Sequence, residues 1–318
     1  MPNPKYPVPE TVSSEAQQRL SQPIPMELNT VPAPTSTEQW LEIIEGSNAG
    51  FKPVVDALAK SDNITIEKTT IASVTVRIIT PNSIPADRAD KLLINLHGGG
   101  YAMLGGDLSI MEAVGMAKAG GFKVISVDYR MPPLHPFPAA VDDGVAVYRA
   151  LLDQYPADSI ALFGASAGGG LSAAVVIAAR DAGLPLPACT VLNTPWSDLN
   201  KIGDSYFSND GVDPVLSSYD GPLGQMAVIY AGEESFSHPL ISPVYADYSK
   251  GFPPTQLVSG TRDLLLSCTV RLHRAMRDAD IEADLHVYEA MWHGFMDVPE
   301  GQTAIAEAIA FIEKHMNL

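Results

Sequence analysis

The chain has 318 residues, of which 46% are apolar, enough to bury the core of one α/β domain with a smaller accessory layer. Its net charge of −17 argues against nucleic acid and anionic membrane surfaces as partners, because both require a basic patch. No apolar run approaches the roughly 18 residues that span a bilayer, and the start MPNPKYPVPE lacks the apolar stretch of a signal peptide, so we expect a cytoplasmic protein without membrane insertion.

The first 60 residues are expected to form an arm and short helices. Residues 1–34 contain eight prolines and little periodicity, which predicts irregular structure. Ser36 can cap a short helix over WLEII, since Gln39 stands three residues later. A second helix is expected around Pro53–Lys60.

Short apolar runs then alternate with helical patterns. Residues 64–68 and 73–80 alternate with period two, as an antiparallel pair does. The later strand candidates are continuous apolar runs, which are typical of a parallel sheet covered on both faces. They are KLLINL, KVISV, SIALFG, CTVLN, TQLVSG and ADLHVYE, with helices near 108–119, 138–154, 167–180, 266–279 and 301–316. The pattern predicts an α/β fold, interrupted at residues 197–250 by an insertion rich in prolines, glycines and aromatic residues.

One serine stands where a predicted strand meets a predicted helix. Ser166 lies within GASAG (164–168), directly after the strand SIALFG. A tight turn there would hold its hydroxyl at the carboxyl edge of the sheet, and small neighbours are needed because strand and helix nearly collide. The helix start also directs free N–H groups toward a developing oxyanion. The pattern predicts a nucleophile.

A dinucleotide-binding fingerprint overlaps the same stretch. Gly168-x-Gly170-x-x-Ala173 matches it nominally, but that site needs an acidic residue about 20 positions later. No Asp or Glu lies between Asp181 and Asp198, and the fingerprint begins several residues beyond the strand end. We therefore reject a dinucleotide site.

A second glycine cluster follows the strand KLLINL. His97 is followed by Gly98, Gly99 and Gly100, whose backbone N–H groups can turn toward a ligand without side-chain obstruction. A phosphate loop would continue with G-K-[ST], which is missing. Together with the N–H of Ala167, the three glycines are expected to form an oxyanion hole, in which each donor is typically worth about 3–4 kcal/mol to the transition state. We interpret His97 as structural.

A base and an acid are expected at the same edge. Of the seven histidines, His293 follows the last strand, ADLHVYE, and precedes a glycine. Asp263 follows the strand TQLVSG, in the chain order Ser…Asp…His. A capping role for Asp263 is the alternative, since Asp is common at helix starts. We expect replacement of Asp213 or Asp247 to cost little activity.

Together these residues resemble the hormone-sensitive-lipase-like, bacterial family IV esterases of the α/β-hydrolase superfamily. The resemblance runs from about residue 65 to the C-terminus. It rests on HGGGY (97–101), DYRMPPLHPFPAAVDD (128–143), GASAGGG (164–170), SPVYAD (242–247), PP (253–254), GTRDLL (260–265) and HGF (293–295). GTRDLLLS and EAMWHGF are similar to a sub-branch of monoterpene ε-lactone hydrolases. The chain departs from the family at Ala165, where the family usually has Asp or Thr. It also departs in two segments: DLLLSC replaces the usual D-P-L-x-D-E, and PPL (132–134) replaces the usual A-P-E.

The resemblance implies an α/β-hydrolase fold with a mostly parallel eight-stranded sheet and a small helical cap. Residues 61–196 and 251–318 would form the catalytic domain, and residues 1–60 and 197–250 the cap. It also implies a serine carboxylesterase with a Ser166–Asp263–His293 triad. No cofactor or metal is implied.

Aromatic side chains in the expected cap and beside His293 are consistent with an apolar substrate pocket, although such residues are mostly core packing. The candidate contacts are Tyr101, Trp196, Trp292, Phe207 and Trp40. The expected substrate is a small neutral ester of short to medium chain length, with lactones as a further class. An amidase or aryl-formamidase activity on the same triad is the alternative, and a non-catalytic small-molecule receptor is disfavoured because His293 is retained.

A homodimer is left open, and Cys189 and Cys268 are expected to be reduced packing residues.

Overall fold

The computed structural model describes residues 6–318, and in that range eight strands form one sheet. Their order is β1-β2-β4-β3-β5-β6-β7-β8, with β2 antiparallel to both β1 and β4 and all other neighbours parallel. The strands are β1 Ile64–Ile71, β2 Val74–Pro81, β3 Leu92–Leu96, β4 Lys123–Val127, β5 Ile160–Ala165, β6 Cys189–Asn193, β7 Thr255–Gly260 and β8 Ala283–Tyr288. The predicted mostly parallel eight-stranded sheet is confirmed.

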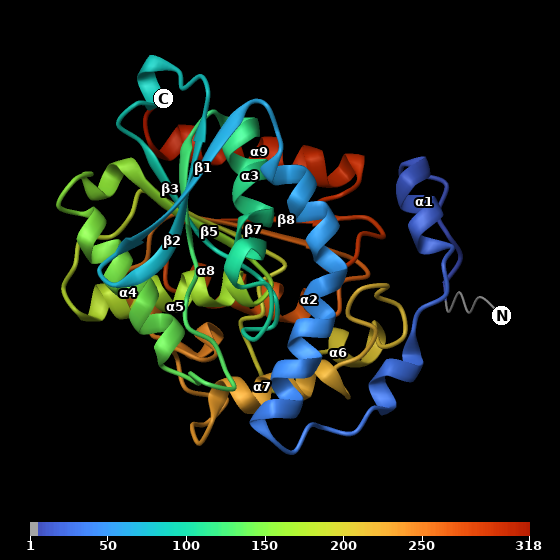
Figure 1. Cartoon of the computed structure of the whole chain (residues 1–318). Helices are drawn as coiled ribbons and strands as arrows, with labels where there is room; N and C mark the ends of the chain where they lie inside the picture. The colour runs from blue at the N-terminus through green and yellow to red at the C-terminus, as the bar shows by residue number, and fades with distance from the viewer. Residues whose placement is uncertain (1–5) are drawn as a thin grey trace.

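Helices cover both faces of the sheet. The helices are α1 Ser14–Leu20, α2 Thr37–Ala59, α3 Ile110–Gly120, α4 Ala139–Leu151, α5 Ala167–Asp181, α6 Ser205–Ser208, α7 Pro222–Ala231, α8 Leu266–Asp278 and α9 Pro299–His315. Helices α4, α5 and α8 pack on one face, while α3 and α9 pack on the other with the end of α2 (Figure 1). Because both faces are covered, every residue of β3, β5, β6 and β7 is buried, which explains why these strands are rich in apolar residues. Polar side chains such as Asn95 and Gln256 are buried with them.

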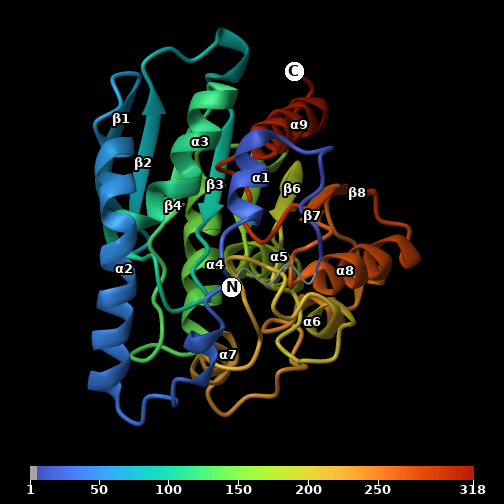
Figure 2. The same cartoon turned by 90° about the vertical axis from the view of Figure 1, so that its right-hand side faces the viewer.

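The two short helices predicted near the N-terminus are one long helix, so that prediction is wrong. Helix α2 begins after Ser36, whose hydroxyl accepts the N–H of Gln39 as expected, and continues through Pro53 (Figure 2). A proline inside a helix costs about 3 kcal/mol. Burial of Val55 and Leu58 against the core that contains α3 and α9 outweighs that cost, because tertiary packing routinely overrides local propensity.

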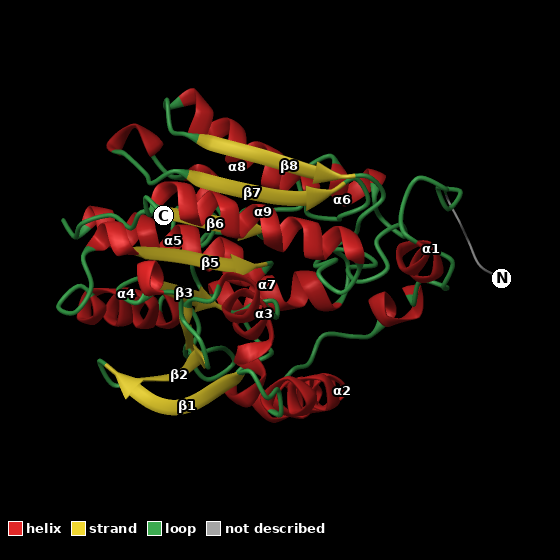
Figure 3. Cartoon of the chain, turned by 90° about the horizontal axis from the view of Figure 1, so that it is seen from above, coloured by secondary structure: helices red, strands yellow, loops and turns green. Residues whose placement is uncertain are grey.

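The parallel strands bring their carboxyl ends to one edge of the sheet. Figure 3 shows β5, β7 and β8 running in the same direction, with α6 beyond the arrowhead of β7. The inserted residues 197–250 carry α6 and α7. Loops from distant parts of the chain therefore meet at this edge, where reactive groups of open α/β sheets lie.

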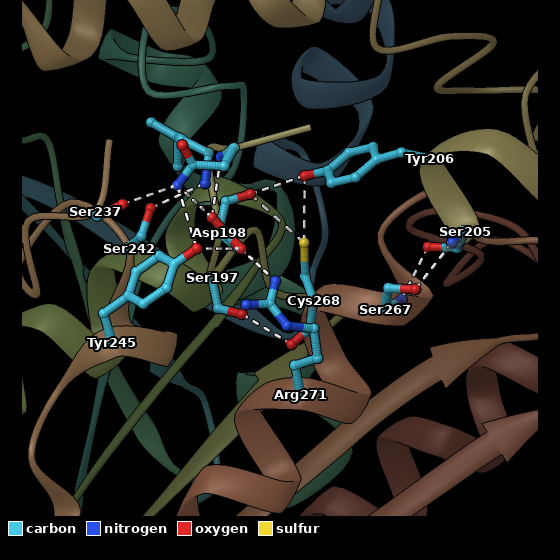
Figure 4. Close-up of polar contacts among 12 residues, drawn as sticks. Ser197, Asp198, Ser205, Tyr206, Ser237, Ser242, Tyr245, Ser267, Cys268 and Arg271 are labelled. Atoms are coloured by element: carbon cyan, nitrogen blue, oxygen red, sulfur yellow. Dashed lines mark hydrogen bonds and ion pairs between the residues drawn. The ribbon is translucent and has the colours of Figure 1, made fainter. Parts of the chain in front are cut away.

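A polar network attaches the insertion to α8 (Figure 4). Asp198, which is completely buried, accepts the hydroxyl of Tyr245 at 3.0 Å and the backbone N–H of Asn200 at 2.9 Å, and it pairs with Arg271 of α8. Nearby, Ser205 and Ser267 each accept the other's backbone N–H, at 2.9 and 2.8 Å. These contacts join the start of the insertion to the helix that follows the β7 loop.

Candidate active site

Ser166 occupies a strained turn between β5 and α5. Its φ of 57° and ψ of −126° lie in a region that L-residues rarely adopt. The turn is fixed by the Ser166 N–H, which donates to the Asn193 carbonyl at 2.9 Å. The Ser166 side chain does not cap α5, so its hydroxyl is left for other chemistry.

The glycines around Ser166 are required by a close approach of backbones. A Cβ atom on Gly164 would lie 2.3 Å from the Leu96 carbonyl oxygen and 2.6 Å from the Gly168 carbonyl carbon. On Gly168 it would lie only 1.9 Å from the same Leu96 oxygen. The predicted strand–helix crowding is confirmed, and the structure adds a further neighbour, the end of β3.

The loop after β3 is fixed by His97, as predicted. Its ring stacks on Tyr129 at a centroid distance of 4.2 Å, and its Nδ1 lies 2.8 Å from the Gly98 carbonyl oxygen. The Tyr129 hydroxyl donates to the His97 carbonyl at 2.7 Å. Burial lowers the pKa of His97 to about 4, although the Gly98 carbonyl acts in the opposite direction, so the ring is neutral at pH 7.

The predicted oxyanion hole needs one correction. The N–H of Gly98 donates to Oε1 of Glu112 at 2.9 Å, so Gly98 is not available to a substrate oxygen and is withdrawn from the set. Gly99 and Gly100 have φ values of 106° and 62°, which glycine adopts without strain. Their N–H groups and that of Ala167, at the first position of α5, remain the candidate donors.

Asp263 and His293 meet on adjacent loops. Oδ1 of Asp263 lies 3.1 Å from Nδ1 of His293, and Asp263 is completely buried. Its carboxylate also accepts the Ser259 hydroxyl at 2.7 Å and the Leu265 N–H at 2.9 Å. The carboxylate is thus held in one orientation, which fixes the imidazole tautomer with its proton on Nδ1.

Three carboxylates act on the pKa of His293. Burial acts to lower the pKa of this histidine, but the hydrogen bond and charge of Asp263, with the charges of Asp213 and Glu112, outweigh burial and raise it. Glu112 also accepts the N–H of Ala165, the residue before Ser166. Glu112 therefore links the serine turn to the glycine loop, and its charge also acts on His293.

Comparison with known proteins shows the family of the chain. A family model described as the alpha/beta hydrolase fold matches residues 93–297, more than half of the chain. The chain belongs to the α/β-hydrolase family. An acetyl-hydrolase of Streptomyces hygroscopicus is 37% identical over 233 residues, covering 72% of this chain and 77% of that protein.

Solved structures narrow the assignment within the family. The crystal structure of esterase E25 is 38% identical, with a TM-score of 0.93 over 99% of this chain and 98% of that one. An esterase from the bacterial hormone-sensitive lipase family is 32% identical, with a TM-score of 0.83 over 96% and 99% of the two chains. The chain is a carboxylic ester hydrolase of the hormone-sensitive-lipase group, as the sequence motifs predicted. The lactone sub-branch stays a prediction.

The five aromatic residues predicted to contact substrate lie in different environments. Trp196 and Trp292 expose at most 1% of their surface. A ring so enclosed cannot touch a ligand in this conformation, so both are packing groups of the hydrolase core. Trp40, at 9% exposure, also packs in the core, whereas Phe207 is 58% exposed beneath the ammonium of Lys201.

Tyr101 links the glycine loop to the insertion. Its ring stacks on Tyr230 of α7 at 3.8 Å, and only 1% of its surface is exposed, so it too is a packing group here. Next to it, a Cβ atom on Gly100 would lie 2.6 Å from Sδ of Met226, also on α7. Helix α7 of the hydrolase thus lies directly against the candidate oxyanion donors.

Two carboxylates of the site were missed by sequence reasoning. Asp213, expected to matter little, is completely buried and accepts the backbone N–H groups of His293 at 3.2 Å and Leu264 at 2.9 Å. Glu112 is the one acidic residue of the helix IMEAVGMAKAG, whose other charged residue is Lys118. An acidic side chain among mostly apolar neighbours was the available signal. For Asp213, within GVDPVL, no spacing pointed to the site.

Other expectations concern the rest of the chain. Cys189 and Cys268 are free and buried, as predicted. In residues 6–318, no group of three or more His, Cys, Asp or Glu side chains could hold a metal ion. Over the same range, no helix has the length and apolar character needed to cross a membrane.

Proposed function

We propose that this esterase hydrolyses short- to medium-chain carboxylic esters through an acyl-enzyme on Ser166, with His293 as base and Asp263 as the acid of the triad. The observation that carries the proposal is the 3.1 Å contact between Asp263 Oδ1 and His293 Nδ1, at the sheet edge where the strained Ser166 turn lies. That arrangement of nucleophile, base and orienting carboxylate is the pattern of serine hydrolysis.

The first half-reaction acylates the serine. Ser166 Oγ attacks the ester carbonyl carbon while its proton passes to Nε2 of His293, and the buried carboxylate of Asp263 stabilises the imidazolium. The N–H groups of Gly99, Gly100 and Ala167 receive the negative carbonyl oxygen. When the tetrahedral intermediate collapses, the C–O bond breaks and Nε2 returns the proton to the leaving alcohol.

The second half-reaction releases the acid. A water gives its proton to Nε2 of His293 as its oxygen attacks the acyl carbon, forming a second tetrahedral intermediate at the same donors. Collapse returns the proton to Ser166 Oγ and frees the carboxylic acid. No oxidant, reductant or metal is required to balance these steps.

The surroundings favour a small, neutral substrate. Met226 of α7 contacts Gly100, which restricts the space above the oxyanion donors. Three carboxylates near the imidazole and a net charge of −17 disfavour anionic substrates. The similarity to an acetyl-hydrolase supports short acyl groups, and we include lactones as a neutral class that the same chemistry opens.

The test is a chain-length series of p-nitrophenyl esters from acetate to dodecanoate, run with the parent and with Ser166→Ala. We expect the highest kcat/KM at short to medium length and a loss of roughly 10⁴–10⁶-fold in the variant. Activity of Ser166→Ala within tenfold of the parent would remove Ser166 from the mechanism.

The same purified protein tests the two alternative functions, an amidase and a non-catalytic receptor. A matched aryl formamide hydrolysed faster than the ester would assign an amidase. Absence of labelling of Ser166 by a fluorophosphonate, together with tight ligand binding, would indicate a receptor without catalysis. We expect ester preference and stoichiometric labelling.

A further inference from the structure

Glu112 lies between the two backbone segments that build the reactive edge. It projects from α3, and Oε1 accepts the N–H of Gly98 at 2.9 Å, while Oε2 accepts the N–H of Ala165 at 2.9 Å. The side chain of Asn95 on β3 donates to Oε2 at 3.3 Å. One carboxylate thus connects the glycine loop to the residue that precedes Ser166.

The sheet itself leaves these amides without ladder partners. Pairing of β3 with β5 ends at Asn95 and Phe163, and the chain after β3 turns away into the glycine loop. The Ser166 N–H points to the β6 side, where it donates to Asn193, so the preceding Ala165 N–H points to the β3 side beyond the end of the ladder. Glu112 supplies the acceptor that the ladder no longer provides.

Burying the Glu112 carboxylate without a cationic partner carries a free-energy cost. Among residues 6–318, Glu112 forms no ion pair with Lys or Arg. Burial raises its pKa to about 7, even though the hydrogen bonds from Gly98, Ala165 and Asn95 act to lower it. Local costs of this kind are expected mainly at functional sites.

The contacts also decide which glycine amides face the substrate. With its N–H directed to Glu112, Gly98 is anchored, and the following peptides of Gly99 and Gly100 are left to turn toward the reacting oxygen. A Cβ atom on Gly98 would lie 3.2 Å from Oε1 of Glu112 and 3.5 Å from the Ser166 Cβ, so carboxylate and nucleophile flank the same glycine. A displacement of the loop would move donors and nucleophile relative to each other.

We infer that Glu112 is a positioning residue of the hydrolytic site. Its carboxylate fixes the position of the glycine loop after β3 relative to the turn that carries Ser166. This inference rests on the function proposed above. We assign Glu112 no role as acid or base, because its carboxylate contacts are to backbone N–H groups and the Asn95 amide, and Nδ1 of His293 is bound to Asp263.

The test compares Glu112→Gln and Glu112→Asp with the parent and with Glu67→Gln, which removes an exposed carboxylate on β1. In Glu112→Gln one oxygen becomes an NH₂ group that faces a backbone N–H, so one of the two contacts is lost. In Glu112→Asp the charge stays, but the shorter side chain cannot bridge both segments. For each variant we measure kcat and KM on p-nitrophenyl butyrate, and the affinity of a trifluoromethyl ketone that adds reversibly to Ser166 as a tetrahedral adduct.

We expect both Glu112 variants to lower kcat by about 10- to 100-fold, below the loss from deleting an oxyanion donor, with KM within about threefold of the parent. Affinity for the trifluoromethyl ketone should fall in proportion to kcat, because that adduct uses the same donors. Glu67→Gln should match the parent. If Glu112→Gln does not fold, Glu112→Asp carries the test.

Other outcomes overturn the inference. If kcat in the folded variants stays within threefold of the parent, or if only KM changes, the relative position of the glycine loop and the Ser166 turn does not depend on Glu112. A lower unfolding midpoint with unchanged kcat would show a purely structural role. An inactive parent whose Ser166 is not labelled by a fluorophosphonate would instead contradict the proposed function, so the two failures are distinguishable.

Discussion

Asp263 and His293 are held together on loops that follow β7 and β8, with Oδ1 and Nδ1 separated by 3.1 Å. The Asp263 carboxylate is itself held in place, since it accepts two further hydrogen bonds, from the Ser259 hydroxyl and the Leu265 N–H. An imidazole held in this way presents Nε2 as its basic nitrogen. The orientation of His293 therefore depends on the Asp263 carboxylate.

Asp263→Asn is expected to lower kcat/KM by up to about 10⁴-fold, because an amide in this position favours the wrong imidazole tautomer. Steady-state kinetics on p-nitrophenyl butyrate measure the loss. Asp247→Asn, at an exposed carboxylate that caps a short turn, is the matched control and should behave like the parent. Equal activities of the two variants would overturn the assignment of Asp263.

The pH dependence follows from the direction of the His293 pKa shift. Nearby carboxylates raise the pKa of His293 above its ordinary value of 6.5, and the base works only when unprotonated. Activity should therefore fall as pH drops through this raised value, and Asp263→Asn should move the acid limb of the kcat/KM profile to lower pH. Glu112 is present in both proteins, so its own titration does not affect the comparison. An unshifted limb would show that Asp263 does not set this pKa.

Much of the fold, and the contact between Asp263 and His293, could be predicted because both have local signatures. Strands covered on both faces must be apolar throughout, and a serine in a strand-to-helix turn must have small neighbours. These constraints act within a few residues, so the sequence showed that Ser166, Asp263 and His293 each follow a strand, at the ends of β5, β7 and β8.

The errors arose where distant contacts decide the structure. Pro53 was expected to separate two helices, but packing of Val55 against the core keeps α2 continuous. The amide of Gly98 was assigned to the oxyanion hole, but Glu112, fourteen residues later, binds it. No period or motif in the sequence encodes either contact.

Asp213 reverses one expectation. Its carboxylate comes from the insertion and joins the loops of Asp263 and His293 by accepting the N–H groups of Leu264 and His293. We now expect Asp213→Asn to lower kcat/KM by about 10- to 100-fold, since small misplacements of catalytic groups have effects of this size. Kinetics beside Asp247→Asn test this, and parental activity in Asp213→Asn would restore the original expectation.

Asp198 should contribute mainly to stability. It is completely buried and pairs with Arg271, so Asp198→Ala leaves a charge and several polar groups without their partner. We expect a loss of about 2–4 kcal/mol in the free energy of unfolding, measured by urea denaturation. Asp278→Asn, which breaks an exposed pair with Arg274 on the same helix, should leave the urea midpoint nearly unchanged. Equal midpoints would show that the network of Figure 4 does not anchor the insertion.

Gly168 and Gly115 make a matched pair for the backbone crowding beneath the nucleophile. Both lie in helices, but a Cβ atom on Gly168 would meet the Leu96 carbonyl oxygen at 1.9 Å, whereas one on Gly115 would meet nothing within 4 Å. Gly168→Ala must push the glycine loop away from α5, so we expect loss of esterase activity and a lower unfolding midpoint. Gly115→Ala should keep activity and gain up to about 1 kcal/mol of stability from helix propensity. A fully active Gly168→Ala would mean that the loop and the nucleophile turn need not lie in contact, and the geometry of the reactive edge would have to be redrawn.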